Sequence, residues 1–225
     1  MKRDYQQHCA IAKALDVVGS RWTLLLIREL LPGPRRFKDL QAGLPGIGTN
    51  LLSDRLRHLE EEGVIEKRVL PPPAGSTVYE LTPLGRQLEG IVLDLSRWGW
   101  RRLDPRDPGD SFHPRWMLMA MKTANDPEAA AGVHETYEFR VGDEVFHVRV
   151  DDGEIRGFDG PAIDPDLVVT SDLESMLRLS DGPHELQRAL EEGRIEAEGA
   201  DEAERHCREI FQAAFSRDAA ALPIG

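Results

Sequence analysis

The spacing of apolar residues separates the chain into a helical first half and a mixed second half. Apolar side chains recur at helical spacing in residues 8–18, 21–31, 36–44 and 49–62, which predicts four helices. Residues 21–31 are so rich in apolar side chains that we expect this helix at the centre of a core. Thr49 is the expected N-cap of the fourth helix, and Gly63 its expected C-cap.

A hairpin and a long helix are predicted to complete the first half. Residues 64–70 and 77–81 have strand-like sequences and flank a loop at 71–76 that is rich in proline and glycine. Thr82 precedes Pro83, an arrangement typical of a helix start. One helix is expected to run from there to about residue 102, because the apolar residues keep helical spacing.

The second half predicts a small α+β domain after a polar linker at residues 104–113. The linker contains prolines and a glycine, which break the preceding helix. Residues 136–141 and 144–150 alternate apolar and polar side chains around Gly142-Asp143, as in a β-hairpin. Further strands are expected at 154–158, 167–170 and 195–199, and helices at 116–121, 173–179, 185–192 and 200–215. We therefore expect one domain at 1–103 and a second at 114–225.

The charge distribution supports this division. The net charge is −12, but residues 1–103 carry 16 Lys and Arg against 12 Asp and Glu, whereas residues 104–225 carry 12 against 28. Only the mildly basic first half could approach phosphates closely. Most carboxylates of the second half can equally form a solvated surface.

Composition excludes several classes of protein. Apolar residues make up 40% and charged residues 30% of the chain, as in ordinary globular proteins. No apolar run approaches the ~18 residues of a membrane span, and the start has no apolar stretch, so we expect a cytoplasmic protein. The cysteines form no framework and the histidines are scattered, so we expect no metal and no cofactor.

Residues 36–62 have the form of a helix-turn-helix. A short helix is followed by a turn with Gly46 and Gly48, and then by a longer helix. In the longer helix, the leucines at 52, 56 and 59 would face the core. The opposite face is polar and carries Asn50, Ser53, Asp54 and Arg57. Such a helix fits the DNA major groove, where asparagine can bind adenine and arginine can bind guanine through paired hydrogen bonds.

Residues around this helix are candidates for contacts that fix its register on DNA, and the 71–76 loop would form a wing. The further candidates are Arg35, Arg36, Lys38, Thr49, Arg55, Lys67, Arg68 and Ser76. The alternative is an ordinary helical fold, because amphipathic helices separated by glycine turns are common. The hairpin directly after the longer helix favours a mainly α winged helix-turn-helix domain.

The run from Cys9 to Trp98 resembles the HxlR family of bacterial winged-helix regulators. The similar stretches are ALDVVG (14–19), RWTLLLIREL (21–30), GPRRFKDL (33–40), LPGI (44–47), LSDRL (52–56), LEEEG (59–63) and YELTPLG (79–85). The resemblance implies a homodimer that binds an inverted-repeat operator in double-stranded DNA. It implies an interface between the first and last helices of the domain, with candidates Leu15, Leu88, Leu95 and Trp98. One departure is Gly48, where the family often has a capping serine that Thr49 would replace.

The same resemblance makes Cys9 a candidate redox sensor. Some members of the family sense electrophiles through a cysteine near the first helix, although the proline that often follows it is Ala10 here. A reactive thiol needs a lowered pKa and exposure, and Lys13 lies close enough in sequence to assist. The alternative is that Cys9 is a small buried hydrophobe.

Residues 114–215 resemble a sterol carrier protein-type domain. The similar segments are the hairpin at 136–150, VDDGEI (150–155), DPDLVVT (164–170) and ALEEGRIEAEG (189–199). That family folds as a mixed sheet covered by helices, with an apolar tunnel that suits a lipid-like ligand. The candidate lining residues are Trp116, Met119, Phe139, Phe146, Val148, Phe158, Met176, Leu177 and Leu190. Each of these can equally be plain core.

Together these features predict a DNA-binding transcriptional regulator that a small apolar effector modulates. The first alternative is a lipid or small-molecule carrier whose helical half only mediates assembly. An enzyme is disfavoured, because the chain has no nucleophile elbow, phosphate loop or convincing Ser/His/Asp set. The adjacent carboxylates Asp151 and Asp152 are better explained as a hairpin cap.

Overall fold

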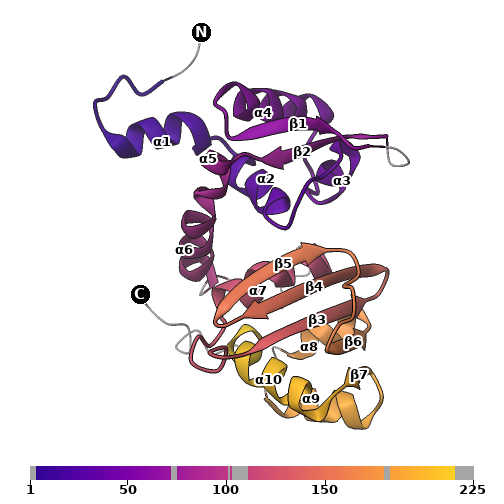
Figure 1. Cartoon of the computed structure of the whole chain (residues 1–225). Coiled ribbons are helices and arrows are strands. Elements are labelled where there is room, and N and C mark those ends of the chain that lie inside the picture. Colours follow the sequence, from indigo (N-terminus) through magenta and orange to yellow (C-terminus); the bar gives the residue numbers. More distant parts are fainter. Residues whose placement is uncertain (1–3, 72–74, 101, 103–110, 180–182, 216–225) are drawn as a thin grey trace. The chain divides into compact units, whose positions relative to one another are not determined.

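The computed structural model describes residues 4–71, 75–100, 102, 111–179 and 183–215 (Figure 1). The chain divides into two compact units, Met1–Val92 and Leu93–Gly225. The order of elements predicted for the first half is confirmed as far as the hairpin, and most of their ends shift by a residue or two. The elements of the first unit are α1 (Ala10–Val18), α2 (Thr23–Leu30), α3 (Phe37–Ala42), α4 (Thr49–Glu61), β1 (Ile65–Val69), β2 (Thr77–Leu81) and α5 (Pro83–Arg86).

Helix α2 contributes strongly to the core of the first unit, as its apolar density predicts. Leu26, Ile27 and Leu30 are completely buried. Leu40 of α3 and the leucines at 52, 56 and 59 of α4 are exposed by no more than 1%. Full burial of one leucine side chain stabilises a fold by about 1.5–3 kcal/mol, so this set holds the helix-turn-helix in one geometry.

The strands β1 and β2 form the hairpin that follows α4. They pair in antiparallel fashion from Ile65 opposite Leu81 to Val69 opposite Thr77. Residues 72–74 of the predicted wing loop lie outside the described residues. The backbone of Arg35 anchors the hairpin, because its N–H and C=O bond to the C=O and N–H of Tyr79 at 2.9 and 2.7 Å.

The two ends of α4 follow from local backbone geometry. Its N-cap is Gly48, so the prediction of Thr49 as N-cap is wrong. Thr49 is the first helical residue, and its hydroxyl accepts a hydrogen bond from Gln41 Nε2 at 3.0 Å. At the other end Gly63 takes a positive φ of 69° after the C-cap Glu62, a conformation that favours glycine.

The long helix predicted after β2 is in fact two helices. Thr82 caps α5 as expected, because its Oγ1 accepts a hydrogen bond from the Gly85 N–H at 3.1 Å. The N–H of Gln87 then bonds to the C=O of Leu84, three residues back, and this tighter turn separates α5 from α6 (Leu88–Trp100). The boundary between the compact units, after Val92, lies within α6. Residues 104–110 of the predicted linker lie outside the described residues.

The second unit is a five-stranded mixed sheet with the order β5-β4-β3-β6-β7. The strands are β3 (His134–Val141), β4 (Glu144–Asp151), β5 (Glu154–Asp159), β6 (Leu167–Ser171) and β7 (Ile195–Gly199). The helical elements are η1 (Pro114–Trp116), α7 (Met117–Thr123), α8 (Leu173–Arg178), α9 (Pro183–Glu191), α10 (Asp201–Phe211) and η3 (Gln212–Phe215). β3 pairs antiparallel with β4 and parallel with β6, and the predicted α+β class is confirmed (Figure 1).

Strand register turns the apolar side chains of this sheet toward its helices. Tyr137 of β3 is buried and meets Phe211 of α10 edge-on, with 6.1 Å between ring centroids. Leu118 of α7 lies against Gly157 of β5 so closely that an added Cβ would be 2.9 Å from it. On the opposite face, His147 stacks on Phe158. Within the described segments, no helix combines the length and apolar character that crossing a membrane requires.

Candidate DNA-binding surface and apolar pocket

The outer side of α4 is a polar stripe above a buried leucine edge. The leucines at 52, 56 and 59 are buried, as their spacing predicts. The residues of the polar stripe are exposed, and they are Asn50, Ser53, Asp54 and Arg57. Positions with this spacing share one face of a helix. The stripe therefore presents hydrogen-bonding groups outward along two turns.

Arg57 is paired with Asp54 inside this stripe. Its Nη2 lies 2.6 Å from Oδ1 of Asp54, and the two side chains are 66% and 55% exposed. A pair this exposed contributes only about 0–1 kcal/mol to stability. Its importance is local, because it orients the guanidinium and reduces the positive charge of the stripe.

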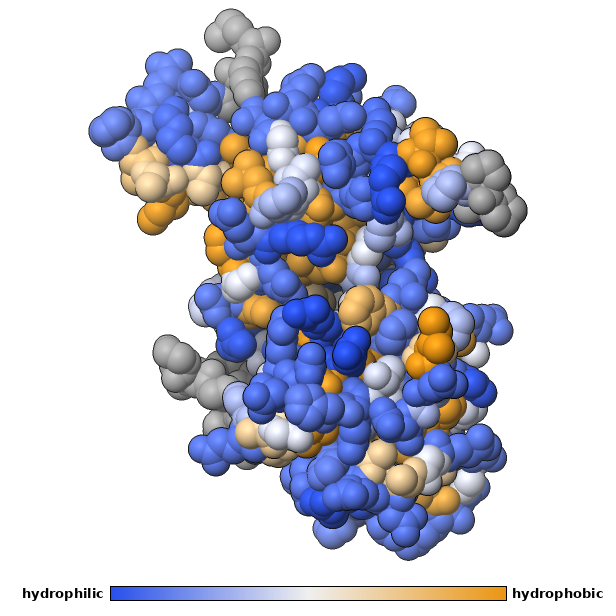
Figure 2. Space-filling model, in the orientation of Figure 1, coloured by the Kyte–Doolittle hydropathy of each residue, from blue (hydrophilic) through white to orange (hydrophobic). Residues whose placement is uncertain are grey.

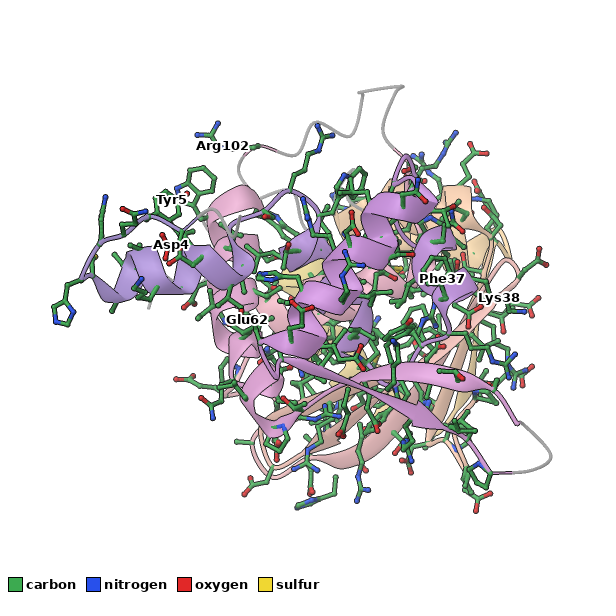
Figure 3. All side chains as sticks on the ribbon, turned by 90° about the horizontal axis from the view of Figure 1, so that it is seen from above. Asp4, Tyr5, Phe37, Lys38, Glu62 and Arg102 are labelled. Atoms are coloured by element: carbon green, nitrogen blue, oxygen red, sulfur yellow. The ribbon has the colours of Figure 1, made fainter. Side chains whose placement is uncertain are left out.

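The predicted cations near the start of the helix-turn-helix differ in accessibility. Lys38 is exposed and projects from the start of α3, on the side of the first unit away from Tyr5 (Figure 3). Arg36 is the half-buried N-cap of α3. Arg55 is also half-buried, and its Nε donates to the carbonyl of Arg21 at 3.2 Å. Lys38 is therefore the most accessible of the three.

The cations at the base of the wing have carboxylate partners. Lys67 Nζ lies 3.1 Å from Glu60 Oε2, and this hydrogen bond raises the pKa of Lys67. Arg68 Nε lies 2.6 Å from Glu80 Oε1. Ser76 is half-buried where the chain returns to β2. Lys67 and Arg68 remain exposed, so phosphates could still compete for them.

Arg35, which was predicted to contact a phosphate, is buried in this structure. The residue is 7% exposed, although its sequence neighbour Arg36 is more accessible. The cause is the backbone bridge to Tyr79, which draws Arg35 under the hairpin. Arg35 therefore serves the packing of the wing.

Cys9 lies at the N-cap of α1 and is exposed, whereas Cys207 is buried. The backbone N–H groups of Ala12 and Ile11 stabilise the thiolate, so the pKa of Cys9 is lowered. Lys13 does not turn to the thiol as expected, because its ammonium group lies 3.4 Å from Asp16. The lowered pKa of Cys9 therefore comes from the backbone N–H groups at the start of α1 and not from Lys13.

Helices α1 and α6 expose large apolar side chains. Leu15, Leu95 and Trp98 were predicted as interface residues, and their exposed fractions are 42%, 46% and 63%. Leu88 is half-buried. Sequence analysis missed Ile11 and Ile91, which are 71% and 54% exposed, although their helical spacing could have identified them. Figure 2 shows apolar side chains gathered along one side of α1.

The second unit contains a cavity of about 390 Å³. Its apolar lining residues are Phe139, Leu167, Val169, Met176, Leu179, Leu186, Leu190, Ile195, Ala197 and Cys207. Three of these, Phe139, Met176 and Leu190, were predicted from the sequence. The polar residues that complete the lining belong to the C-terminal segment, and they are Glu204, Arg208, Glu209 and Gln212.

The other predicted lining residues do not line this cavity. Phe146 and Val148 are buried on β4, two strands away from β6. Trp116 and Met119 belong to η1 and α7, and Leu177 is 44% exposed on α8. Phe158 lies on the opposite face of the sheet. Gly157 faces α7, and successive residues of a strand point to opposite faces. The helix predicted at 200–215 is present as α10 and η3, but its position along the cavity was not predicted.

Charged residues at the edge of the cavity are paired along α10. Arg208 Nη2 lies 3.9 Å from Glu204 Oε1, and Arg205 Nη1 lies 3.0 Å from Glu209 Oε2. Inside, burial raises the pKa of the Cys207 thiol, which keeps it protonated. The described residues contain no group of three or more His, Cys, Asp or Glu that could hold a metal ion.

Comparison with known proteins relates the first unit to a family of regulators. Residues 17–107 match the model of the HxlR-like helix-turn-helix family. The chain is 38% identical over 93 residues to the uncharacterized HTH-type transcriptional regulator YvaP of Bacillus subtilis, a match that covers 41% of this chain and 86% of YvaP. The chain belongs to the HxlR-like helix-turn-helix family. A second relative, the HTH-type transcriptional regulator YodB of the same organism, is 33% identical over 94 residues, which cover 42% of this chain and 84% of YodB.

The cavity lies in a segment with a different resemblance. Residues 117–211 match the model of the SCP-2 sterol transfer family. The HxlR-like match ends at residue 107, so the two matched segments do not overlap. Among solved structures, the reduced form of YodB from B. subtilis covers 46% of this chain and 100% of its own, with 31% sequence identity and a TM-score of 0.38.

Proposed function

We propose that the protein is a transcriptional regulator that places α4 in the major groove of an operator. The observation that carries this proposal is the exposed polar stripe of α4 above its buried leucine edge. Short polar side chains and arginine on such a helix reach base edges in a groove about 12 Å wide. YvaP and YodB are themselves named HTH-type transcriptional regulators, which supports the same function here.

The roles of individual residues follow from exposure. Asn50, Ser53 and Arg57 would contact base edges, with Asp54 orienting Arg57. The residues that would contact the sugar-phosphate backbone are Arg36, Lys38, Thr49, Arg55, Lys67, Arg68 and Ser76. Backbone contacts of this kind supply affinity and salt dependence, whereas base contacts supply specificity.

A homodimer would cover the exposed apolar side chains of α1 and α6. Residues such as Ile11, Leu15 and Trp98 are costly to leave in water, and burying them on a second copy removes that cost. Two reading helices related by twofold symmetry would bind half-sites about one helical turn apart. The operator is therefore expected to be an inverted repeat.

A small apolar molecule in the cavity would modulate this binding. Helix α10 lines the cavity, and the carbonyl of Ile210 in α10 accepts a hydrogen bond from Asp126 at 2.8 Å. Three residues before Asp126, the carbonyl of Thr123 accepts a hydrogen bond from Arg97 Nε of α6 at 3.3 Å. A ligand that moves α10 could thus move α6, whose first residues belong to the first unit. The ligand would act only if it binds the DNA-competent and incompetent states with different affinity.

The cavity itself supports the alternative function, a carrier of small apolar molecules whose helical half only mediates assembly. The two functions differ in their behaviour toward DNA. A carrier would bind DNA weakly and without sequence preference, whereas the regulator must prefer one sequence.

The deciding experiment is selection of bound duplexes from a random pool by the purified full-length protein. The proposal expects a palindromic consensus whose half-sites are spaced by about one helical turn. The matched control is the double variant Asn50→Ala with Arg57→Ala, which keeps the leucine edge intact and should enrich no consensus. Enrichment of no sequence by the parent protein would reject the regulator in favour of the carrier.

A further inference from the structure

The size of the cavity limits what it can hold. Its 390 Å³ correspond to about thirteen water volumes, at about 30 Å³ for each water. A methylene group displaces a similar volume, so a ligand that fills the cavity has about a dozen non-hydrogen atoms.

The interior of the cavity offers no charge to a ligand. Its walls come from the sheet residues Phe139, Leu167, Val169 and Ala197 and from apolar residues of the covering helices. Cys207 is the polarizable group among them, and burial keeps its thiol neutral by raising its pKa. A charged group placed inside would lose its hydration without gaining a partner.

The charges at the rim already compensate one another. Glu204 and Arg208 lie one helical turn apart and approach to 3.9 Å, and Glu209 is held by Arg205 at 3.0 Å. An anionic head group that bound Arg208 would leave the half-buried Glu204 without its partner. A cationic head group at Glu204 would do the same to Arg208. A neutral head group leaves both pairs intact.

We propose that this cavity binds a neutral, mainly apolar molecule of about a dozen non-hydrogen atoms, such as a medium-chain alcohol, in preference to a charged molecule such as a fatty acid. This inference rests on the proposed function and specifies the class of its effector. The hydroxyl group of such a ligand would reach the rim beside Gln212, and its chain would fill the space above Phe139.

The first test compares three molecules of equal length and different charge, namely decanol, decanoate and decylammonium. Calorimetric titration of the full-length protein is expected to give a dissociation constant for decanol at least about tenfold lower than for either ion, because each ion must break a rim pair or lose its hydration inside the cavity. Equal or tighter binding of decanoate or decylammonium overturns the proposal, as does the absence of decanol binding.

Matched rim variants test the reason for the preference. Glu204→Gln leaves Arg208 without its partner, and decanoate should then bind at least about fivefold more tightly, a larger change than for decanol. Arg208→Gln leaves Glu204 unpaired and should favour decylammonium to a similar degree. If neither variant changes the order of the three molecules, the paired rim does not set the preference.

Two leucine substitutions test the location of the site. Ala197→Leu adds volume on the cavity side of β7 and should weaken decanol binding at least about tenfold. Thr170→Leu introduces the same leucine side chain on the exposed side of β6 and should leave binding unchanged. Thermal denaturation without ligand shows whether each variant folds, and Ala197→Val replaces the first if it does not. Loss of binding in both, or in neither, contradicts the assignment.

The same protein preparation separates this inference from the proposed function. A palindromic consensus from duplex selection together with a preference for decanoate would retain the regulator and reject the neutral effector. Decanol binding without any selected duplex would reject the regulator. The preference of the cavity for a neutral ligand would then belong to a carrier protein.

Discussion

At the scale of single residues, three cations on the proposed DNA surface are held in ion pairs. Arg57 is held by Asp54, Lys67 by Glu60 and Arg68 by Glu80. A phosphate must compete with a carboxylate for each of these cations, which reduces the sequence-independent part of DNA affinity. The surface is therefore suited to discrimination between sequences.

Replacing Arg57 should relax sequence preference. In the proposed complex, Arg57→Ala would remove a bidentate base contact worth about 1–3 kcal/mol of discrimination, so affinities for the selected duplex and for a duplex altered in one half-site should converge. Lys38→Ala is the matched control, because Lys38 would contact only phosphates. It should weaken both duplexes equally and reduce the slope of log K against log salt by about 1. Binding like the parent by both variants would contradict the groove-facing assignment of α4.

Cys9 should react at a lower pH than an ordinary thiol. The N–H groups of Ala12 and Ile11 favour the thiolate and lower its pKa, so the fraction of reactive thiolate at neutral pH rises. Alkylation by iodoacetamide, followed by mass spectrometry across a pH series, should show a lower midpoint for Cys9 than for a free cysteine treated in the same way. Buried Cys207 serves as the internal control and should stay unmodified in the folded protein. A midpoint at or above that of free cysteine would remove Cys9 from consideration as a sensor.

Gly85 should tolerate no side chain. A Cβ at this position would lie 2.1 Å from the carbonyl oxygen of Val64, so the start of α5 would have to move away from the hairpin. Gly85→Ala is expected to lower the free energy of unfolding by about 1–3 kcal/mol, measured by urea denaturation. Gly90→Ala, in the interior of α6 with no atom within 4 Å of the added Cβ, should be neutral or stabilising. Equal effects of the two substitutions would show that the close approach to Val64 is not the cause.

At the scale of elements, helices and strands with regular residue patterns were predicted well, whereas contacts between distant parts of the chain were not. The leucine spacing of α4 and the alternation of β3 and β4 define their own periods, so both were found from the sequence. The burial of Arg35 depends on Tyr79, more than forty positions away in the chain, and local patterns carry no trace of it. The cavity was predicted only in part, because the lining depends on which helix covers which strand. Phe158 is an example, because a strand position one residue away from a helix-facing one points to the other face of the sheet.

The exposed apolar faces of α1 and α6 should control the oligomeric state. Leu15→Glu places a charge on the proposed interface and should shift sedimentation from two chains toward one, with loss of affinity for the selected duplex. Ile163→Glu is the matched control, because Ile163 is 92% exposed in the second unit and should tolerate the same change. A dimer that survives Leu15→Glu unchanged would place the interface elsewhere.

At the scale of the whole molecule, α6 is the element common to both units. It begins before the boundary at Val92 and continues to Trp100, and Arg97 connects it to the end of α7. The function proposed for the chain requires this helix to carry the state of the cavity to the DNA-binding unit. Coupling of this kind is reciprocal, so DNA must change ligand affinity as much as the ligand changes DNA affinity.

Removing the Arg97 hydrogen bond should uncouple the two sites. Arg97→Gln shortens the side chain that bonds to Thr123, so decanol should alter the dissociation constant of the selected duplex less than it does for the parent. Decanol affinity without DNA should be unchanged, which separates lost coupling from lost binding. Arg178→Gln, at an exposed ion pair of α8, is the control and should keep the full effect. An undiminished decanol effect in Arg97→Gln would exclude this route.

The central claim is that two copies of this chain bind one operator through α4. Its most direct test is a sedimentation titration of the selected duplex with the full-length protein at salt concentrations between about 50 and 200 mM. We predict two chains on each duplex and an affinity that falls steeply as salt rises, with a random duplex bound at least about a thousandfold more weakly. A single chain on each duplex, or equal affinity for the selected and random duplexes, would contradict the account.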